Sequence, residues 1–171
     1  GKKAEGQKEL QRFSLLTQQA EERKRLIQEV RHQPADAARW YQLGLAYMRG
    51  EKYRAAIQAY HRSIELGYPS EKPYEALGQV YFRLNAIEEA QRMFQVALEI
   101  NPHSADVYNS LGICCFMQGQ FEQAIEYMKR AIQLQPRELF YLNLSKAYQQ
   151  LGRIPEAEAA YKTYQELKSH P

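Results

Sequence analysis

Apolar residues recur along this chain at spacings that predict amphipathic α-helices. An aromatic residue is followed by Leu three positions later, by Gly in most copies four positions later, and usually by Tyr seven positions later. Residues at these spacings lie on one face of an α-helix, so this first signature predicts a helix with one buried face. Its four copies begin at Trp40, Tyr74, Tyr108 and Tyr141.

A second signature follows each copy of the first. It consists of Ala and a bulky residue four positions later, which again share one helix face. Its copies are Ala56 with Tyr60, Ala90 with Phe94, Ala124 with Met128, and Ala157 with Tyr161. Short segments containing Gly or Asn separate the two signatures and provide residues that end helices. Each unit is therefore predicted to be a helical hairpin.

The period of this pattern resembles that of the tetratricopeptide repeat family. The leading aromatic residue recurs after 34, 34 and 33 residues, and Pro102 and Pro136 close the second and third units. The resemblance covers roughly residues 37 to 171. It implies an all-α fold, a right-handed superhelix of four helical hairpins, preceded here by one long helix. The expected domains are an N-terminal amphipathic helix at 1–36 and a four-repeat domain at 37–171, with repeats at 37–70, 71–104, 105–137 and 138–171.

Three copies of the first signature place Gly in the middle of a predicted helix. Gly costs about 1 kcal/mol relative to Ala at such a position, so Gly44, Gly78 and Gly112 indicate that the second helix of each hairpin crosses there closely. We expect the alanines of the second signature to be the small partners at this crossing. Ser145 replaces Gly in the fourth copy.

The segment before the repeats, from about Glu5 to Gln33, lacks both signatures but predicts a long helix. Its partial apolar stripe consists of Leu10, Phe13, Leu16, Ala20, Ile27 and Val30. A break is expected near the basic run at 23–25. Because solenoids need their end faces covered, one interpretation is a cap against residues 37–49, which predicts a monomer. The other is an arm that reaches a partner, an upstream membrane anchor or a second copy, and pairing through residues 5–33 predicts a dimer.

Composition sets broad limits on function. With 44% hydrophobic and 25% charged residues, the chain has enough apolar material for a folded core. Its formal net charge of +3 is small, so nucleic acid is not the expected partner. No apolar run approaches the roughly 18–20 residues that span a bilayer, so we expect no membrane insertion by this segment. Residue 1 is Gly rather than Met, which leaves open an upstream targeting segment and the choice between a cytoplasmic and a periplasmic location.

Residues capable of catalysis or metal binding are scattered along the chain. The histidines show none of the spacings of a metal site and are expected to be solvated: His32, His61, His103 and His170. Cys115 takes the place of the signature Tyr, which predicts a packing role, and the adjacent Cys114 has no nearby His as a base. There is no glycine-rich phosphate loop. We therefore expect no enzyme activity, no cofactor and no metal.

A binding surface remains as the candidate functional site. In arrays that resemble this one, the first helices of the hairpins line the concave side. The candidate groove residues are Tyr41, Leu45, Met48, Arg49, Gln79, Phe82, Arg83, Asn109, Ile113, Phe116, Leu142 and Lys146. Interhelix packing is the alternative interpretation of the apolar ones. The Lys and Asn residues of the carboxylate clamp found in chaperone-binding relatives are absent from the matching positions.

Three functions stay open on these grounds. The first is a noncatalytic protein-interaction scaffold whose groove binds a protein or peptide segment with apolar anchors and some acidic residues. The second is the soluble part of a membrane- or envelope-associated bacterial assembly factor, of the pilus or cytochrome c maturation type. The third is a self-association module that acts through the N-terminal helix.

Overall fold

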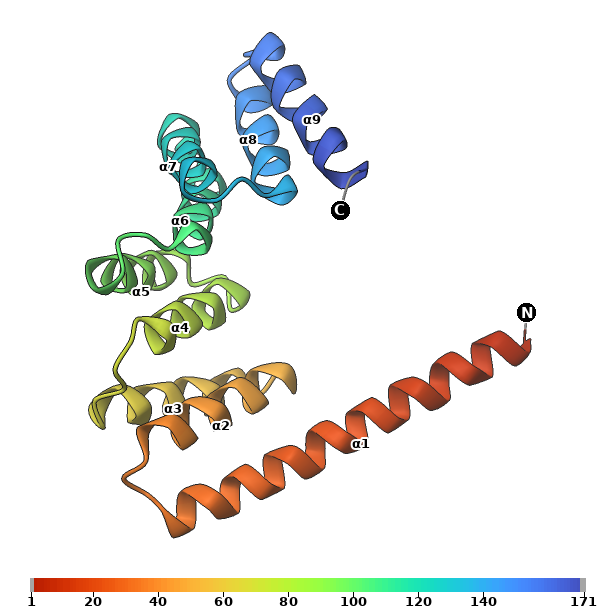
Figure 1. The fold of residues 1–171 in the computed structure, drawn as a ribbon, viewed down its shortest axis with the longest axis vertical. Coiled ribbons are helices and arrows are strands. Elements are labelled where there is room, and N and C mark those ends of the chain that lie inside the picture. Colours follow the sequence, from red (N-terminus) through yellow and green to blue (C-terminus); the bar gives the residue numbers. More distant parts are fainter. Residues whose placement is uncertain (1, 170–171) are drawn as a thin grey trace. The chain divides into compact units, whose positions relative to one another are not determined.

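The computed structural model describes residues 2–169, which form nine α-helices (Figure 1). The prediction of an all-α fold built from helical hairpins is confirmed. The helices are α1 (Lys2–His32), α2 (Ala37–Arg49), α3 (Tyr53–Glu65), α4 (Lys72–Arg83), α5 (Ile87–Ile100), α6 (Ala105–Met117), α7 (Phe121–Leu134), α8 (Glu138–Gln150) and α9 (Ile154–Ser169). Helices α2, α4, α6 and α8 carry the first signature, and α3, α5, α7 and α9 carry the second.

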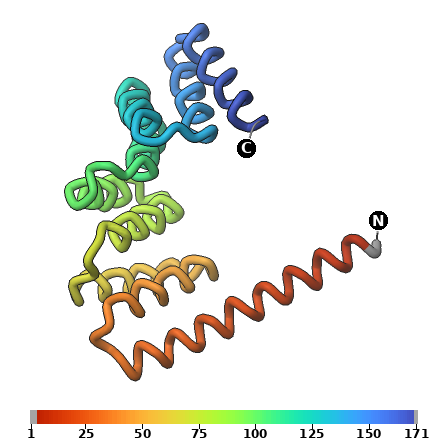
Figure 2. Tube along the Cα trace, viewed as in Figure 1, coloured from red at the N-terminus to blue at the C-terminus, as the bar shows by residue number. Residues whose placement is uncertain are grey.

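The chain divides after Pro69 into two compact units. Unit 1 contains α1, α2 and α3, and unit 2 contains α4 to α9. Within unit 1, α2 packs against both α1 and α3; within unit 2, α4 pairs with α5, α6 with α7, and α8 with α9. In unit 2 each hairpin also packs against the next through α5 with α6 and α7 with α8. The trace of each unit can be followed in Figure 2.

The turns inside the hairpins end their helices as the sequence predicts. Gly119 and Gly152 have positive φ angles of 76° and 68°, and Asn85 has a φ of 59° in the corresponding turn of α4. In the turn after α2, the residue with positive φ is Glu51 rather than the neighbouring Gly50. The start of α2 is capped by a side chain: the Asp36 carboxylate accepts from the backbone N–H groups of residues 38 and 39 at 3.0 and 3.1 Å.

The signature glycines lie against bulky side chains of the paired helix. A Cβ placed on Gly78 would lie 2.5 Å from Cε1 of Phe94, and a Cβ on Gly112 would lie 2.8 Å from Cγ of Met128. Gly44 faces the ring of Tyr60 in the same way. The expectation that the alanines are the close partners is therefore wrong for Gly44 and Gly78. The glycines make room for the larger residue of the second signature, one helical turn further on.

Ser145 has a specific contact that explains its presence in place of Gly. Its side chain is fully buried, and its hydroxyl donates a hydrogen bond to the backbone carbonyl of Ala157 at 2.8 Å. Ser63 makes a similar bond to the carbonyl of Ala37 at 2.7 Å. Because each buried hydroxyl has an acceptor, these two polar residues fit inside apolar hairpin cores without a desolvation penalty.

Helix α1 has two different halves. Its C-terminal half buries Leu26 and Val30, each 5% exposed, in a cluster with Leu43 of α2, and therefore caps unit 1. Its N-terminal half leaves Leu10 and Phe13 71% exposed. The helix continues without interruption through 23–25, so the predicted break there is wrong. The cap interpretation thus fits the C-terminal half, and the arm interpretation stays a prediction for the exposed half.

None of the helices in residues 2–169 combines the length and apolar character that a bilayer-spanning helix needs.

Candidate functional site

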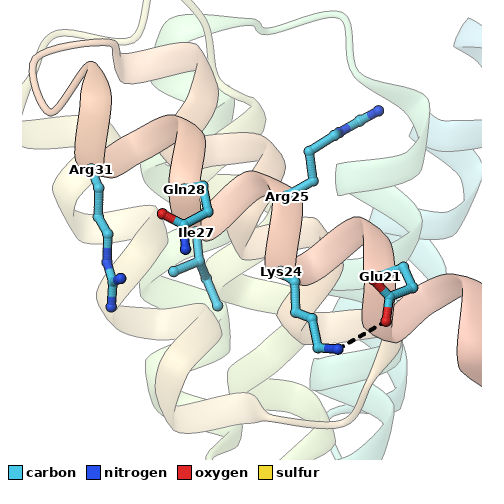
Figure 3. Close-up of a pocket in the computed structure, with 6 residues that line it drawn as sticks. All are labelled: Glu21, Lys24, Arg25, Ile27, Gln28 and Arg31. Carbon is cyan, nitrogen blue, oxygen red and sulfur yellow. Dashed lines mark hydrogen bonds and ion pairs between the residues drawn. The ribbon is translucent and has the colours of Figure 1, made fainter.

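Two surface depressions of the described chain lie on α1 and have no enclosing walls. One has a volume of about 390 Å³ and is lined by six residues of α1 alone, including the ion pair of Lys24 with Glu21 at 2.9 Å (Figure 3). The other, of about 600 Å³, is lined by four residues of the same helix. A single helix presents a convex surface, so neither depression can hold a ligand on more than one side.

A third depression, of about 230 Å³, lies within unit 1 among α1, α2 and α3. Its walls are signature residues that pack the hairpin, among them Trp40, Leu43 and Tyr47. The only charged side chain in its lining is Arg31, at the end of α1. It is an apolar gap at the cap, with few polar groups to orient a ligand.

The fourth depression combines apolar walls with polar groups and lies entirely within unit 2. It has a volume of about 190 Å³ and is formed by α6, α7 and α8. We call it the α6–α8 cleft. Its lining residues are Ile113, Phe116, Met117, Met128, Asn143 and Lys146. Three of these, Ile113, Phe116 and Lys146, are among the groove residues proposed from the sequence.

The apolar residues of the α6–α8 cleft differ in how tightly they are packed. Met128, at 1% exposure, is fixed in the core of the α6/α7 hairpin, where it lies against Gly112. Phe116 packs edge-on against Phe121, with ring centroids 5.3 Å apart. Met117 is 57% exposed at the end of α6 and is free to adjust its rotamer. The cleft therefore has a rigid floor and one adaptable side.

Two asparagines join α6 and α8 beside the cleft. The Nδ2 of Asn143 donates to Oδ1 of Asn109 at 3.1 Å, and the two residues are 34 positions apart. This bond uses one donor of Asn143 and one lone pair of Asn109. The amide of Asn109 and the Oδ1 of Asn143 make no other hydrogen bond among residues 2–169. The pair can therefore donate to and accept from a peptide backbone at the same time.

Charge differs between the cleft and the far end of the first helices. Lys146, at the rim of the cleft, is exposed and has no ion pair within the described chain. Glu75, in the first turn of α4, has its pKa raised by burial and by the nearby carboxylates of Asp106 and Glu71. Asp106 is itself paired with Arg137 at 2.6 Å. The first-helix surface of unit 2 is therefore acidic near the start of α4 and α6 and basic at the cleft.

Comparison with protein-family models decides the family. Tetratricopeptide repeat models match residues 37–66, 72–104, 105–138 and 140–171. The chain belongs to the tetratricopeptide repeat family. Each match corresponds to one of the four hairpins, from α2/α3 to α8/α9. A search of curated proteins finds no match.

Solved structures with the same fold include other tetratricopeptide repeat proteins. A MamA fragment from Desulfovibrio magneticus RS-1 has a TM-score of 0.81 at 22% identity, and the alignment covers 99% of this chain and 97% of that one. Another MamA structure has a TM-score of 0.79 at 24% identity, with 86% of each chain covered. YrrB, described as a tetratricopeptide repeat protein with an unusual peptide-binding site, has a TM-score of 0.73 at 16% identity, with 92% and 81% covered. Identities this low establish the shared fold alone.

Membership of the tetratricopeptide repeat family sets the general class of the protein. Proteins of this family are noncatalytic scaffolds for protein interactions, so the chain is assigned to the interaction scaffolds. The partner and the residues that contact it are not given by the family.

The groove residues proposed from the first repeat all lie on unit 1. The ring of Tyr41 is 5.9 Å from that of Tyr60 and 4.9 Å from that of Tyr68, so it takes part in hairpin packing. Leu45 and Met48 are half-buried on α2. Arg49 donates to Glu22 of α1 at 2.7 Å and so has an acidic partner within its own unit.

The proposed residues of the second to fourth repeats lie on unit 2. Phe82 is half-buried against the α5–α6 cluster, Arg83 is exposed, and Gln79 donates to Glu75 at 3.2 Å. Leu142 is half-buried on α8. The structure brings Asn109 and the three cleft residues together around α6, whereas the side chains on α4 form no part of the cleft lining.

Sequence reasoning did not include Met128 or Asn143 among the site residues. Met128 was assigned to packing through the second signature, and it does pack, but one side of it also forms the cleft floor. The repeat pattern gives no signal for Asn143, because the step to the fourth copy is 33 residues and Leu142 is the equivalent of Asn109.

The scattered histidines and cysteines form no site in the described residues. His32, His61 and His103 are exposed, and His170 lies outside the described residues. No group of ligating side chains within residues 2–169 could hold a metal ion. Burial raises the pKa of Cys114 to about 12, and Cys115 beside it is buried and accepts a hydrogen bond from Gln91 at 3.6 Å. A thiol with so high a pKa is not a nucleophile near neutral pH.

Proposed function

We propose that the protein is a noncatalytic interaction scaffold that binds a peptide segment of a partner protein along the first helices of unit 2, with the α6–α8 cleft as the main contact. The observation that carries this proposal is the position of the cleft beside the Asn109–Asn143 pair. The cleft offers apolar contact, and the pair offers one free donor and one free acceptor for a backbone. These are the two requirements for binding a short peptide.

The cleft can supply a useful share of the binding energy. Burying one apolar side chain of the size of Leu or Phe contributes about 1.5–3 kcal/mol. The backbone contacts to the asparagines would then fix the direction and register of the segment. YrrB, a neighbour of the same fold, has a peptide-binding site, which is consistent with this use of the fold.

The proposed partner segment has apolar anchors and some acidic residues. Lys146 and Arg83 are exposed and have no ion pair within the described chain, so each can form an ion pair with a carboxylate of a partner. Exposed ion pairs contribute only about 0–1 kcal/mol each, so the apolar anchors should set affinity and the charges should set register. Binding should accordingly weaken only modestly between low and physiological salt.

Selection of peptides from a random phage library tests this proposal. Peptides selected on the full chain should bind much more weakly to Phe116→Ala, with the helical circular dichroism signal retained. Ile154→Ala is the matched control, because Ile154 is exposed on α9 and lies outside the cleft. If every selected peptide bound Phe116→Ala and the parent equally well, the cleft would not be the binding site.

A second candidate function is self-association through α1. The specific observation is that Leu10, Phe13 and Leu16 are 71%, 71% and 55% exposed on one helix. A second copy could cover these side chains. Light scattering should then show a dimer that Phe13→Glu converts to a monomer and Gln11→Glu leaves intact. A monomer for the parent chain at all concentrations would exclude this function.

A further inference from the structure

Resting on the proposed function, we infer that the α6–α8 cleft selects an aromatic side chain, and that the partner segment carries an acidic side chain close to it that pairs with Lys146. The inference names the chemistry of the partner at this one subsite. It is drawn from the residue types that line the cleft, among them a lysine without an ion pair in the described residues.

The apolar lining consists mainly of sulfur and aromatic groups. Met117 and Met128 contribute thioethers to the lining, and Phe116 contributes a benzene ring. Thioether sulfur makes favourable contacts with the edges of aromatic rings, and two aromatic rings attract each other edge to face. An aliphatic side chain in the same space would gain neither contact. The lining therefore favours Phe, Tyr or Trp over Leu or Val.

The size and shape of the cleft also suit a ring. The cleft has a volume of about 190 Å³ and its walls are mostly apolar. Water in such a space has few hydrogen-bond partners, so an inserted apolar side chain should displace it favourably. Met117 is 57% exposed and can close over an inserted ring, whereas Met128 beneath it is held in the core.

The position of Lys146 sets the place of the acidic side chain. In an extended segment, side chains two residues apart lie on the same face. Suppose that the backbone of the segment is bound by Asn109 and Asn143 and that one aromatic side chain enters the cleft. The side chain two positions further along the segment then points to the same side, toward α8. Lys146 lines that side and has no ion pair within the described residues. A carboxylate there would neutralise it.

The four methionines of the chain provide an internal probe for this site. Met117 and Met128 line the cleft, while Met93 lies on α5 and Met48 on α2. Protein labelled with ¹³C in the methionine methyl groups would be titrated with the capped peptide acetyl-Gly-Phe-Gly-Glu-Gly-amide at millimolar concentrations. Signals of Met117 and Met128 should shift, and that of Met93 should not. Capping both ends leaves the Glu side chain as the only carboxylate.

Matched peptides then separate the two parts of the inference. Replacing Phe with Leu should weaken binding by about threefold or more, because the sulfur and ring contacts are lost. Replacing Glu with Gln should weaken binding about two- to fivefold, as expected for one exposed ion pair. The variant Lys146→Glu should remove the preference for Glu over Gln. Lys162→Glu, which makes the same charge change on α9, should keep it.

Several results would overturn the inference. Unshifted Met117 and Met128 signals with the Phe peptide would show that the cleft takes no aromatic side chain. Equal binding of the Phe and Leu peptides, or of the Glu and Gln peptides, would show that the cleft lacks the chemistry assigned to it. If peptides selected from a library still depended on Phe116 in these cases, the proposed function would stand and only this inference would fail. If the Met117 and Met128 signals did not shift and the selected peptides also did not depend on Phe116, the proposed function would fail as well.

Discussion

Replacing Gly78 with Ala should destabilise unit 2, although Ala is the better helix former. Gly78 lies in the middle of α4, where its Cα faces the ring of Phe94 on α5. A Cβ at this position would lie 2.5, 2.7 and 2.9 Å from Cε1, Cδ1 and Cζ of that ring. Phe94 is 1% exposed, so the ring has no open space to move into.

Two opposing contributions determine the size of the effect. Ala gains about 1 kcal/mol over Gly in a helix interior. Overpacking a filled core costs about 1–3 kcal/mol, and a ring held at these distances belongs to the upper part of that range. The net loss should therefore be about 1–2 kcal/mol in the free energy of unfolding. For a unit of this size, a loss of 1 kcal/mol lowers the melting temperature by about 4–8 °C.

Urea unfolding followed by circular dichroism would measure this loss. A double-mutant cycle with Phe94→Leu then isolates the contact, because a leucine side chain lacks the ring atoms that approach the new Cβ. The coupling energy should be about 1 kcal/mol or more, with Gly78→Ala less harmful when Phe94→Leu is already present. Gly6→Ala is the control, because a Cβ at Gly6 meets nothing within 4 Å and should not destabilise the protein.

The reasoning would be refuted if Gly78→Ala were as stable as the parent chain or more stable. That result would mean that helix propensity outweighs packing at this crossing. The glycine of the first signature would then need another explanation.

The remaining predictions concern a buried hydroxyl, a carboxylate and the cap. Tyr60→Phe should raise the free energy of unfolding by about 1 kcal/mol in urea, because the buried Tyr60 hydroxyl has no hydrogen-bond partner in the described residues; a clear loss would contradict this. The pKa of Glu75 is raised in the folded state, so its ionisation costs stability as the pH rises through that raised pKa. Glu75→Gln should therefore stabilise the protein at pH 7 and have little effect below the unfolded-state pKa of about 4.3, and equal effects at both pH values would refute it. Leu26→Ala should cost about 2–5 kcal/mol in unit 1, whereas the exposed Leu10→Ala should cost almost nothing; similar thermal shifts for both would show that α1 does not cap the unit.

The hairpins could be predicted from the sequence because each signature describes contacts between neighbouring helices. The spacing of Ala90 and Phe94 alone indicates which face of α5 is buried, and the turn at Asn85 shows where α4 ends. Local spacing of this kind needs no knowledge of distant contacts. The helical architecture of the repeats was therefore fully accessible from residue order.

The course of α1 could be predicted only in part, because it depends on the length of its neighbour. A helix of 31 residues is about 46 Å long, whereas the 13 residues of α2 cover only about 20 Å. The excess length has nothing in unit 1 to pack against, so Leu10 and Phe13 stay exposed. The residue types of the apolar stripe do not reveal which part of α1 packs on unit 1 and which part stays exposed.

The charges of the candidate site depend on pairings that residue order does not reveal. The sequence alone suggests that Arg49 is a free groove cation, yet it pairs with Glu22, which lies 27 residues earlier on another helix. Asp106 likewise pairs with Arg137, 31 residues later. Such ion pairs depend on how the helices stack. The net charge of the candidate site could therefore be determined only from the structure. The cleft could be predicted only in part for the same reason, since three helices contribute to it.

The bond between Asn109 and Asn143 has a consequence for where a partner can be held. The two residues are not equivalent, because the step from the third to the fourth copy of the first signature is 33 residues and the equivalent of Asn109 is Leu142. Successive repeats of unit 2 therefore carry different side chains at this position, namely Glu75, Asn109 and Leu142. Recognition by the asparagine pair is accordingly local to α6 and α8. Adding a hairpin would lengthen the scaffold without adding a second asparagine pair.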